Sequence, residues 1–176
     1  MIEGRAIIED IDTAKSSVES LGAKSKNNYS FKDIIFVPKA EEYSLSNDFV
    51  RVRVYIKTNW PTKNVVLVRK NMEWKNHGKI DNVVLREEFD SQEEAFAYID
   101  KNLGSDFEKG FDYNREGWEY ELDSCRIFIE DIKGYRPTIE IEAEDEEGLK
   151  ILFNKIGVLE IVKNSVPEIM RKKLKF

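Results

Sequence analysis

The sequence predicts an α+β domain in which eight mostly antiparallel strands close into a barrel-like tunnel, with charged side chains in the lumen and helices packed outside. Two segments with alternating charge indicate this fold. Phe49–Lys57 alternates basic with apolar residues, and Thr138–Glu144 alternates glutamates with apolar residues. Successive side chains on a strand point to opposite faces, so each segment has one charged and one apolar face. The apolar faces need a cover, and we therefore expect helices outside the sheet and charges inside it.

The expected strands are rich in Val, Ile, Phe and Tyr and are separated by turn-forming residues. They cover residues 4–9, 28–37, 48–58, 63–71, 80–90, 107–122, 125–132 and 137–144. The short connections favour antiparallel neighbours. A closed sheet of eight strands is wide enough to hold one small ligand.

Three helices are expected from side chains that can cap a first turn. They are a helix after Asp10 that ends at Gly22, one from Ser91 to about Asn102, and one after Asp145 that ends near Gly157. Residues 159–174 are expected to hold one or two further short helices, broken by Pro167. Because no linker or repeat interrupts these elements, we expect one domain over residues 1–176.

Composition excludes several classes of protein. The net charge of −6 argues against general nucleic-acid binding, which usually needs a basic surface. No apolar run approaches the roughly 20 residues of a membrane helix, and the first residues do not resemble a signal peptide. Cys125 is the only cysteine, so neither an internal disulfide nor a cysteine zinc cluster can form. We expect a cytoplasmic protein without nucleic-acid or membrane partners.

The two alternating segments carry opposite charges. Arg51 and Arg53 share one strand face, and Glu140 and Glu142 share another. Carboxylates stacked on one face repel one another and usually need a cation. If both faces line one cavity, it can hold a polyanion and the metal ion that travels with it. The alternative from the residues alone is a pair of solvated faces with nearby counter-charges.

Several further motifs follow in an order and spacing that carry more weight than any one of them. They are Glu3-Gly4-Arg5, Leu21-Gly22-Ala23-Lys24, Asp33-Ile34-Ile35-Phe36, Val50-Arg51-Val52-Arg53, Lys70, Arg86-Glu87-Glu88, Arg115-Glu116-Gly117-Trp118, Ile129-Glu130-Asp131-Ile132 and Glu140-Ile141-Glu142. With these motifs the chain resembles the CYTH superfamily, the triphosphate tunnel metalloenzymes. Within it, the class IV adenylate cyclases and the thiamine triphosphatases are the most similar branches.

The resemblance implies a role for each group of residues. A triphosphate carries about four negative charges, which arginine can meet in bidentate fashion and lysine as a point charge. The implied substrate-binding residues are Arg5, Arg51, Arg53, Lys70, Arg86 and Arg115. The implied catalytic carboxylates are Glu88 and Glu130. Glu3, Glu140 and Glu142 are the implied ligands of the cofactor, Mg²⁺ or Mn²⁺, because hard cations prefer carboxylate oxygens.

The chain also departs from the family pattern. Met1 stands where the first glutamate of the N-terminal motif is expected, and a thioether is a poor ligand for a hard cation. Arg5 replaces a lysine and Glu130 an aspartate, while the lysine expected just before Arg115 is absent. The resemblance with these changes predicts a weakened metal site and slow, Mn²⁺-preferring turnover.

The resemblance implies a metal-dependent phosphohydrolase or cyclase that acts on a nucleoside or organic triphosphate. The expected partner is a small molecule with a triphosphate group: ATP, thiamine triphosphate or inorganic triphosphate. Of the three tryptophans, Trp74 is the one expected to contact a base or ring of this ligand. The sequence leaves open whether the protein forms a homodimer. Two alternatives also stay open: a non-catalytic polyphosphate- or nucleotide-binding module with a degenerate metal site, and an unrelated sheet around an apolar ligand.

Overall fold

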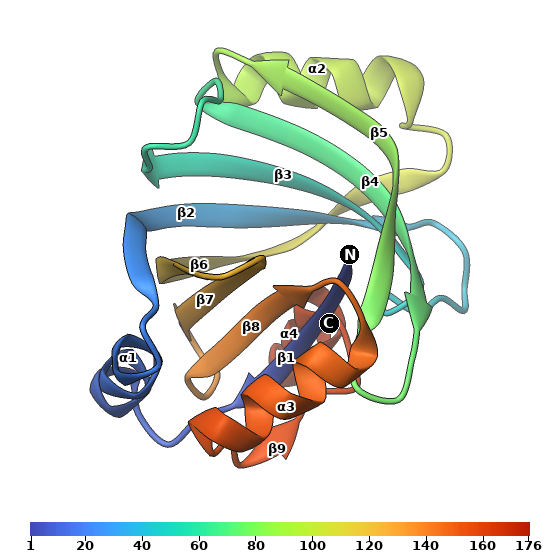
Figure 1. Ribbon diagram of the computed structural model, residues 1–176. Helices are drawn as coiled ribbons and strands as arrows, with labels where there is room; N and C mark the ends of the chain where they lie inside the picture. Colours follow the sequence, from blue (N-terminus) through green and yellow to red (C-terminus); the bar gives the residue numbers. More distant parts are fainter.

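The computed structural model describes residues 1–176 and contains one nine-stranded antiparallel sheet that closes on itself (Figure 1). The strand order is β5-β4-β3-β2-β6-β7-β8-β1-β9, and β1 also pairs with β5. The strands are β1 (Ile2–Ile7), β2 (Lys24–Pro38), β3 (Asp48–Lys57), β4 (Val65–Trp74), β5 (Lys79–Phe89), β6 (Phe107–Leu122), β7 (Cys125–Ile132), β8 (Thr138–Ala143) and β9 (Glu160–Ile161). The α+β class and the closed antiparallel sheet are as predicted.

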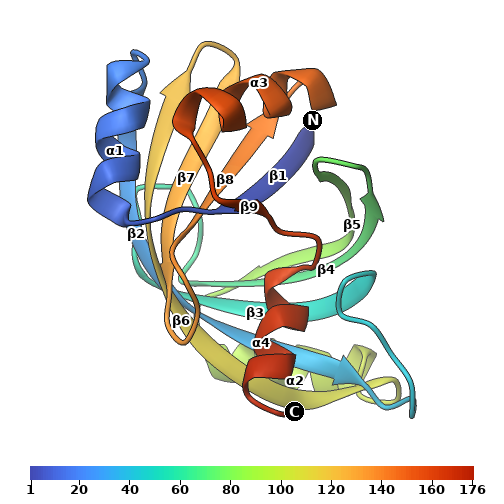
Figure 2. The same cartoon turned by 90° about the horizontal axis from the view of Figure 1, so that it is seen from below.

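The chain has four helices, of which the first three lie outside the ring and the fourth packs across one end of its lumen. They are α1 (Ile11–Ser20), α2 (Gln92–Asn102), α3 (Glu146–Ile156) and α4 (Val166–Lys173). The first three begin at the predicted caps, because Asp10, Ser91 and Asp145 each accept a hydrogen bond from an amide of the first turn. Figure 2 shows α1 and α3 over the part of the sheet that holds β1, β7 and β8. None of the helices is long and apolar enough to cross a membrane.

The helices cover the apolar strand faces, as the alternation predicted. Val50 and Val52 of β3 are fully buried and pack in one cluster with Ile99 of α2. Ile139 and Ile141 of β8 are equally buried, in a cluster with α1 and α3. Each such side chain stabilises the fold by roughly 1.5–3 kcal/mol. Burial of these faces outside the ring forces the charged faces of β3 and β8 inward.

The charged side chains of the lumen are concentrated in its middle, whereas the prediction does not distinguish the middle from the ends. Alternate residues of β2 run along the inside in the order Tyr29, Phe31, Asp33, Ile35 and Val37. The first two belong to an aromatic cluster, and the last two belong to an apolar cluster that α4 covers. Asp33 lies between these clusters and is fully buried. The two apolar ends therefore enclose a short charged segment.

The ring closes at a single point. β1 and β5 share only one register pair, Glu3 with Lys79. Glycine is required there on both strands, because the backbones approach too closely for a side chain. A Cβ added at Gly78 would lie 2.4 Å from the Glu3 carbonyl oxygen, and one at Gly4 would lie 2.8 Å from the His77 carbonyl oxygen. The motif Glu3-Gly4-Arg5 thus serves the closure as well as the cavity.

The C-terminal segment agrees with its prediction in having one short helix, α4, and differs in two other respects. Glu160–Ile161 forms the short strand β9 beside β1, where a helix was expected. Pro167 does not break a helix but lies in the first turn of α4, which Ser165 caps. Proline is well tolerated there, because the first-turn amides have no partner inside a helix.

Candidate functional site

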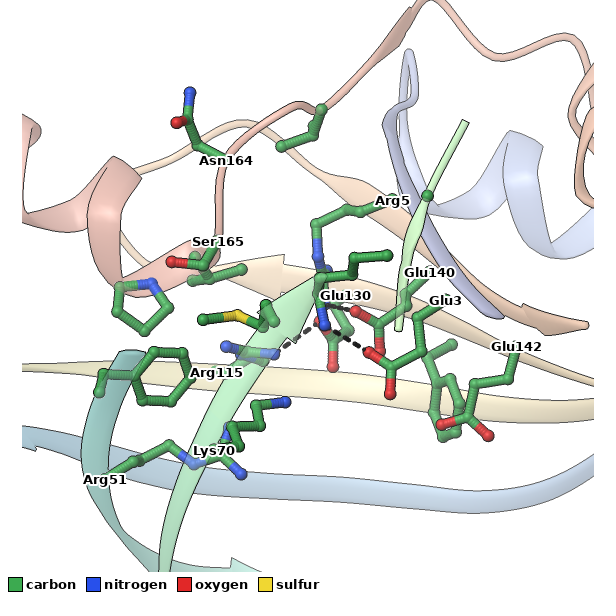
Figure 3. A pocket seen from close by; sticks show the side chains of 18 of the residues that line it. Glu3, Arg5, Arg51, Lys70, Arg115, Glu130, Glu140, Glu142, Asn164 and Ser165 are labelled. Atoms are coloured by element: carbon green, nitrogen blue, oxygen red, sulfur yellow. Dashed lines mark hydrogen bonds and ion pairs between the residues drawn. The ribbon is translucent and has the colours of Figure 1, made fainter. Parts of the chain in front are cut away.

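A cavity of about 280 Å³ occupies the charged middle of the ring (Figure 3). This volume is near the lower end of the roughly 300–1,000 Å³ of small-molecule sites. Arg51 and Lys70 approach it from β3 and β4. Glu3 and Glu140 approach it from β1 and β8 on another side, and Figure 3 shows Arg5 and Arg115 among the carboxylates there.

The basic side is organised around Asp33. Arg53 makes a bidentate contact with this carboxylate, through Nε at 2.7 Å and Nη2 at 2.9 Å. Arg115 approaches the same carboxylate at 3.4 Å. Burial alone would raise the pKa of Asp33, but Arg53 and then Arg51 lower it well below its usual range. Asp33 is therefore a fixed anion that orients the cations around it.

Arg51 is the least satisfied of these cations. Its Nε is buried without a hydrogen-bond partner and lies 3.9 Å from Asp33. Burial, followed by repulsion from Arg53, lowers the pKa of Arg51. The Nε of Arg115 and the hydroxyl of Tyr113 are also buried without partners. Polar groups of this kind are costly to bury, so they are natural contacts for an anionic ligand.

A second network links Glu130 to both sides of the cavity. Its carboxylate accepts from Arg5 at 2.7 Å, from Arg115 at 3.1 Å and from the Tyr29 hydroxyl at 2.6 Å. Burial would raise the pKa of Glu130, but Arg115 and Arg5 lower it overall. Three donors occupy this carboxylate, so Glu130 holds the arginines in place.

Arg5 lies between two carboxylates. Its second terminal nitrogen donates to Glu140 at 2.6 Å. Burial would raise the pKa of Glu140, but Arg5, Lys79 and other cations lower it to about 2. Arg5 and Glu140 are also direct partners in the β1–β8 register, so the pair is fixed by the sheet.

Four charges form a row across the ring closure. The register places Arg126 of β7 opposite Glu142 of β8, Glu142 opposite Glu3 of β1, and Glu3 opposite Lys79 of β5. Arg126 donates to Glu142 at 3.2 Å, and Lys79 donates to Glu3 at 2.7 Å. Burial and then the nearby Glu140 raise the pKa of Glu142 to about 7. We call these four residues the closure row.

Lys79 also joins the basic side of the cavity. It donates to Asp81, and Lys70 donates to the other oxygen of the same carboxylate. Burial would lower the pKa of Lys79, but Glu3, Glu140 and Asp81 raise it. Lys79 therefore stays charged at neutral pH, although it is only 9% exposed.

Comparisons with known proteins bear on the fold. No family model and no curated protein matches the chain. Among solved structures, PH1819 from Pyrococcus horikoshii OT3 has a TM-score of 0.77 at 16% identity, over 98% of both chains. HpAC1 from Hippeastrum, a proposed adenylyl cyclase with a dominant triphosphatase activity, has a TM-score of 0.69 at 16% identity, over 97% of this chain and 95% of its own. A proposed adenylate cyclase from Vibrio parahaemolyticus has a TM-score of 0.68 at 12% identity, over 96% and 95%.

The chain shares its fold with these proteins. The match covers nearly the whole chain. At identities of 12–16%, this similarity shows a shared fold but does not show a shared activity.

The carboxylates do not fit the predicted divalent cation as they lie. No group of three or more Asp, Glu, His or Cys side chains is arranged to hold a metal ion. The three predicted ligands instead have cationic partners: Lys79 for Glu3, Arg5 for Glu140 and Arg126 for Glu142. A hard divalent ion needs several free carboxylate oxygens, so these ion pairs compete with it directly.

Most of the residues singled out in the sequence line the cavity. They are Glu3, Arg5, Arg51, Arg53, Lys70, Arg115, Glu130, Glu140 and Glu142. Arg86 and Glu88 do not, and they are left out of the site. They pair with each other at 2.8 Å near the far end of β5. A strand rises about 3.3 Å per residue, so Arg86 lies on the order of 20 Å along β5 from Lys79.

Sequence reasoning gave no site role to Asp33, Lys79, Asp81 or Arg126. Lys79-Ile80-Asp81 carries the same alternation of charged and apolar residues that marked β3 and β8, and this signal could have located it. Asp33 belongs to one of the resembling motifs, but its role depends on arginines that are distant in sequence.

Two tryptophans line the cavity. Trp74, the one predicted to touch a ring, is the last residue of β4 and donates from Nε1 to the Ser46 carbonyl oxygen at 2.6 Å. Trp60 donates from Nε1 to Glu119 at 2.7 Å and packs against Tyr29 with ring centroids 4.6 Å apart. Both rings are thus held in place by hydrogen bonds.

Proposed function

We propose that the cavity binds the triphosphate group of a nucleoside or organic triphosphate. The observation that carries this proposal is Arg51, which lines the cavity and whose buried Nε has no hydrogen-bond partner. Phosphate oxygens match arginine N–H groups in charge and geometry. The unpartnered Nε of Arg115 offers a second donor of the same kind.

The balance of fixed charges supports an anionic ligand on the basic side. Asp33 meets Arg53 closely but Arg51 only at 3.9 Å, so one guanidinium is left without a close counter-charge. Lys70 lies beside it, and burial together with Lys79 and Arg51 lowers the pKa of Lys70. A phosphate chain between Arg51 and Lys70 would supply the missing negative charge.

The solved neighbours add support by analogy of fold. HpAC1 is a proposed adenylyl cyclase with a dominant triphosphatase activity, and other neighbours are proposed adenylate cyclases. On this analogy the bound triphosphate would react with water in a phosphohydrolase or with its own ribose hydroxyl in a cyclase. Either reaction in its metal-dependent form requires a divalent ion to displace Lys79 or Arg5 from their carboxylates.

A second candidate is favoured by those ion pairs. In a non-catalytic polyphosphate- or nucleotide-binding module, the carboxylates have no metal to hold and are neutralised by side chains. The pairing of Glu3, Glu140 and Glu142 with Lys79, Arg5 and Arg126 is what such a module would contain. Both candidates share the binding of the triphosphate group.

Product analysis distinguishes the candidates. The protein is incubated with ATP, thiamine triphosphate or inorganic triphosphate, each with Mg²⁺, Mn²⁺ or EDTA, and the products are separated by ion-exchange chromatography. Orthophosphate indicates the phosphohydrolase, and cyclic nucleotide with pyrophosphate indicates the cyclase. The same incubations with Arg51→Met are the control, because product that forms there at an undiminished rate does not arise in this cavity. Binding without any product favours the module, and absence of both binding and product contradicts the proposal.

A further inference from the structure

We propose that the Lys79 ammonium takes the place of a divalent cation beside Glu3, so that the cavity binds a phosphate chain without a metal. This inference rests on the proposed triphosphate binding for its ligand. The inference is based on the closure row, in which Lys79 and Arg126 flank the two carboxylates Glu3 and Glu142. Each carboxylate of the row thus has a basic side chain as its neighbour within the sheet register.

The position of Lys79 is fixed by the fold. Its backbone forms the one register pair that joins β5 to β1, and the glycine before it allows the close approach. Its Nζ donates to Glu3 at 2.7 Å and also to Asp81. The side chain is buried and held at both partners, so it cannot swing away without breaking two ion pairs.

Lys79 influences all three carboxylates around it. Glu3, Glu140 and Asp81 raise its pKa in that order, after the opposing effect of burial. A divalent ion bound to Glu3 and Glu140 would lie next to this ammonium and would be repelled by it. The metal and the lysine therefore compete for Glu3.

The same ammonium can serve the ligand. An ammonium has three donors, and two of those on Lys79 are used by Glu3 and Asp81. Lys70 shares Asp81 with it, which places two ammonium groups on the cavity wall. A phosphate chain would contact these cations directly rather than through a metal.

The first test needs no phosphate. Mn²⁺ binding to the protein is followed by the loss of the free-ion signal in electron paramagnetic resonance. We expect no saturable Mn²⁺ binding to the unmodified protein up to the highest concentration used. Lys79→Met should bind Mn²⁺ saturably, with a Kd at least tenfold below that concentration. Lys79→Met combined with Glu3→Gln should lose that gain. Lys75→Met, an exposed lysine of the same hairpin, is the matched control and should behave like the parent.

Lys79→Arg keeps the charge and covers the case in which Lys79→Met does not fold. It should bind no more Mn²⁺ than the unmodified protein. Mn²⁺ binding by the unmodified protein as tight as that of Lys79→Met would overturn the inference. A folded Lys79→Met without any gain, or specific Mn²⁺ binding by the unmodified protein when Lys79→Met cannot be prepared, would overturn it too.

The second test uses tripolyphosphate and titration calorimetry. Affinity should be highest in EDTA and should fall at least severalfold in excess Mg²⁺, because Mg²⁺ sequesters the free phosphate chain. Binding that requires Mg²⁺ would overturn the inference and leave triphosphate binding intact. Absence of tripolyphosphate binding in both buffers would contradict the proposed function, while the Mn²⁺ titrations would still decide the role of Lys79.

Discussion

Lys79 and Glu3 contact each other through both backbone and side chain where the sheet closes. Their backbones are register partners, and Lys79 Nζ lies 2.7 Å from Glu3 Oε2. The closure of the fold and the neutralisation of the cavity thus depend on one pair of residues. The two backbones can approach this closely only because residue 78, next to Lys79, is a glycine. Changes at the closure should therefore affect stability and the cavity together.

Gly78→Ala tests the closure. The added Cβ would lie 2.4 Å from the Glu3 carbonyl oxygen, so the two strands must separate. We expect a loss of about 1–3 kcal/mol in the free energy of unfolding, the usual cost of overpacking. Urea denaturation measures it. Gly148→Ala is the control, because its Cβ would meet only side-chain atoms, the nearest at 3.3 Å. Unchanged stability in both variants would contradict the tight closure.

Asp33→Asn tests the anchor of the basic side. The change leaves Arg53 and Arg115 without their shared buried anion, which should cost about 3–5 kcal/mol of unfolding free energy. The control is Asp48→Asn, whose ion pair with Arg69 is about one-third exposed and should be worth no more than about 1 kcal/mol. Equal losses in thermal and urea denaturation would show that Asp33 is no anchor.

Glu142→Gln tests the raised pKa in the closure row. Because the folded pKa is about 7 and the ordinary value is 4.5, the folded protein holds a proton that the unfolded chain releases between these values. Stability should fall as pH rises through this window and stay low above it. The variant has no such titration and should be more stable at pH 8, by at most about 3 kcal/mol, with the gap closing toward pH 4.5. Parallel stability profiles from pH 4.5 to 8 would contradict the assignment.

Arg51→Met tests whether the Arg51 guanidinium lowers the stability of the unliganded protein. Its Nε has no partner, so removal of the charge should leave the unfolding free energy unchanged or raise it by up to about 1 kcal/mol. Arg53→Met removes the bidentate partner of Asp33 and should cost about 3 kcal/mol. A large loss for Arg51→Met in urea denaturation would mean that its guanidinium stabilises the fold.

Much of the fold could be predicted because local patterns specify it. The alternation of Arg51 and Arg53 with valines assigned both faces of β3, and the capping residues located α1, α2 and α3. The closure could not be predicted in this way. It depends on a contact between β1 and β5, which are about 70 residues apart, and on glycines whose role appears only when the backbones meet.

The candidate site was predictable in its members but not in their pairing. Alternation identified Glu140 and Glu142 as inward carboxylates, yet their partners Arg5 and Arg126 come from other strands. Arg86 fits the sequence pattern but does not line the cavity, because its side chain is half exposed and pairs with Glu88. β5 continues along β4 to Phe89, well past its contact with β1 at Lys79. How far a strand continues depends on its pairing with other strands, so a short motif cannot predict it.

Titration calorimetry of tripolyphosphate with Arg51→Met tests the central claim most directly. The unmodified protein should bind, and Arg51→Met should bind at least tenfold more weakly, since a hydrogen bond to a charged group contributes about 1.5–3 kcal/mol. Arg86→Met removes an arginine that lies outside the cavity and should match the unmodified protein. Equal affinity of Arg51→Met and the unmodified protein, or an equal loss in Arg86→Met, would contradict triphosphate binding in this cavity.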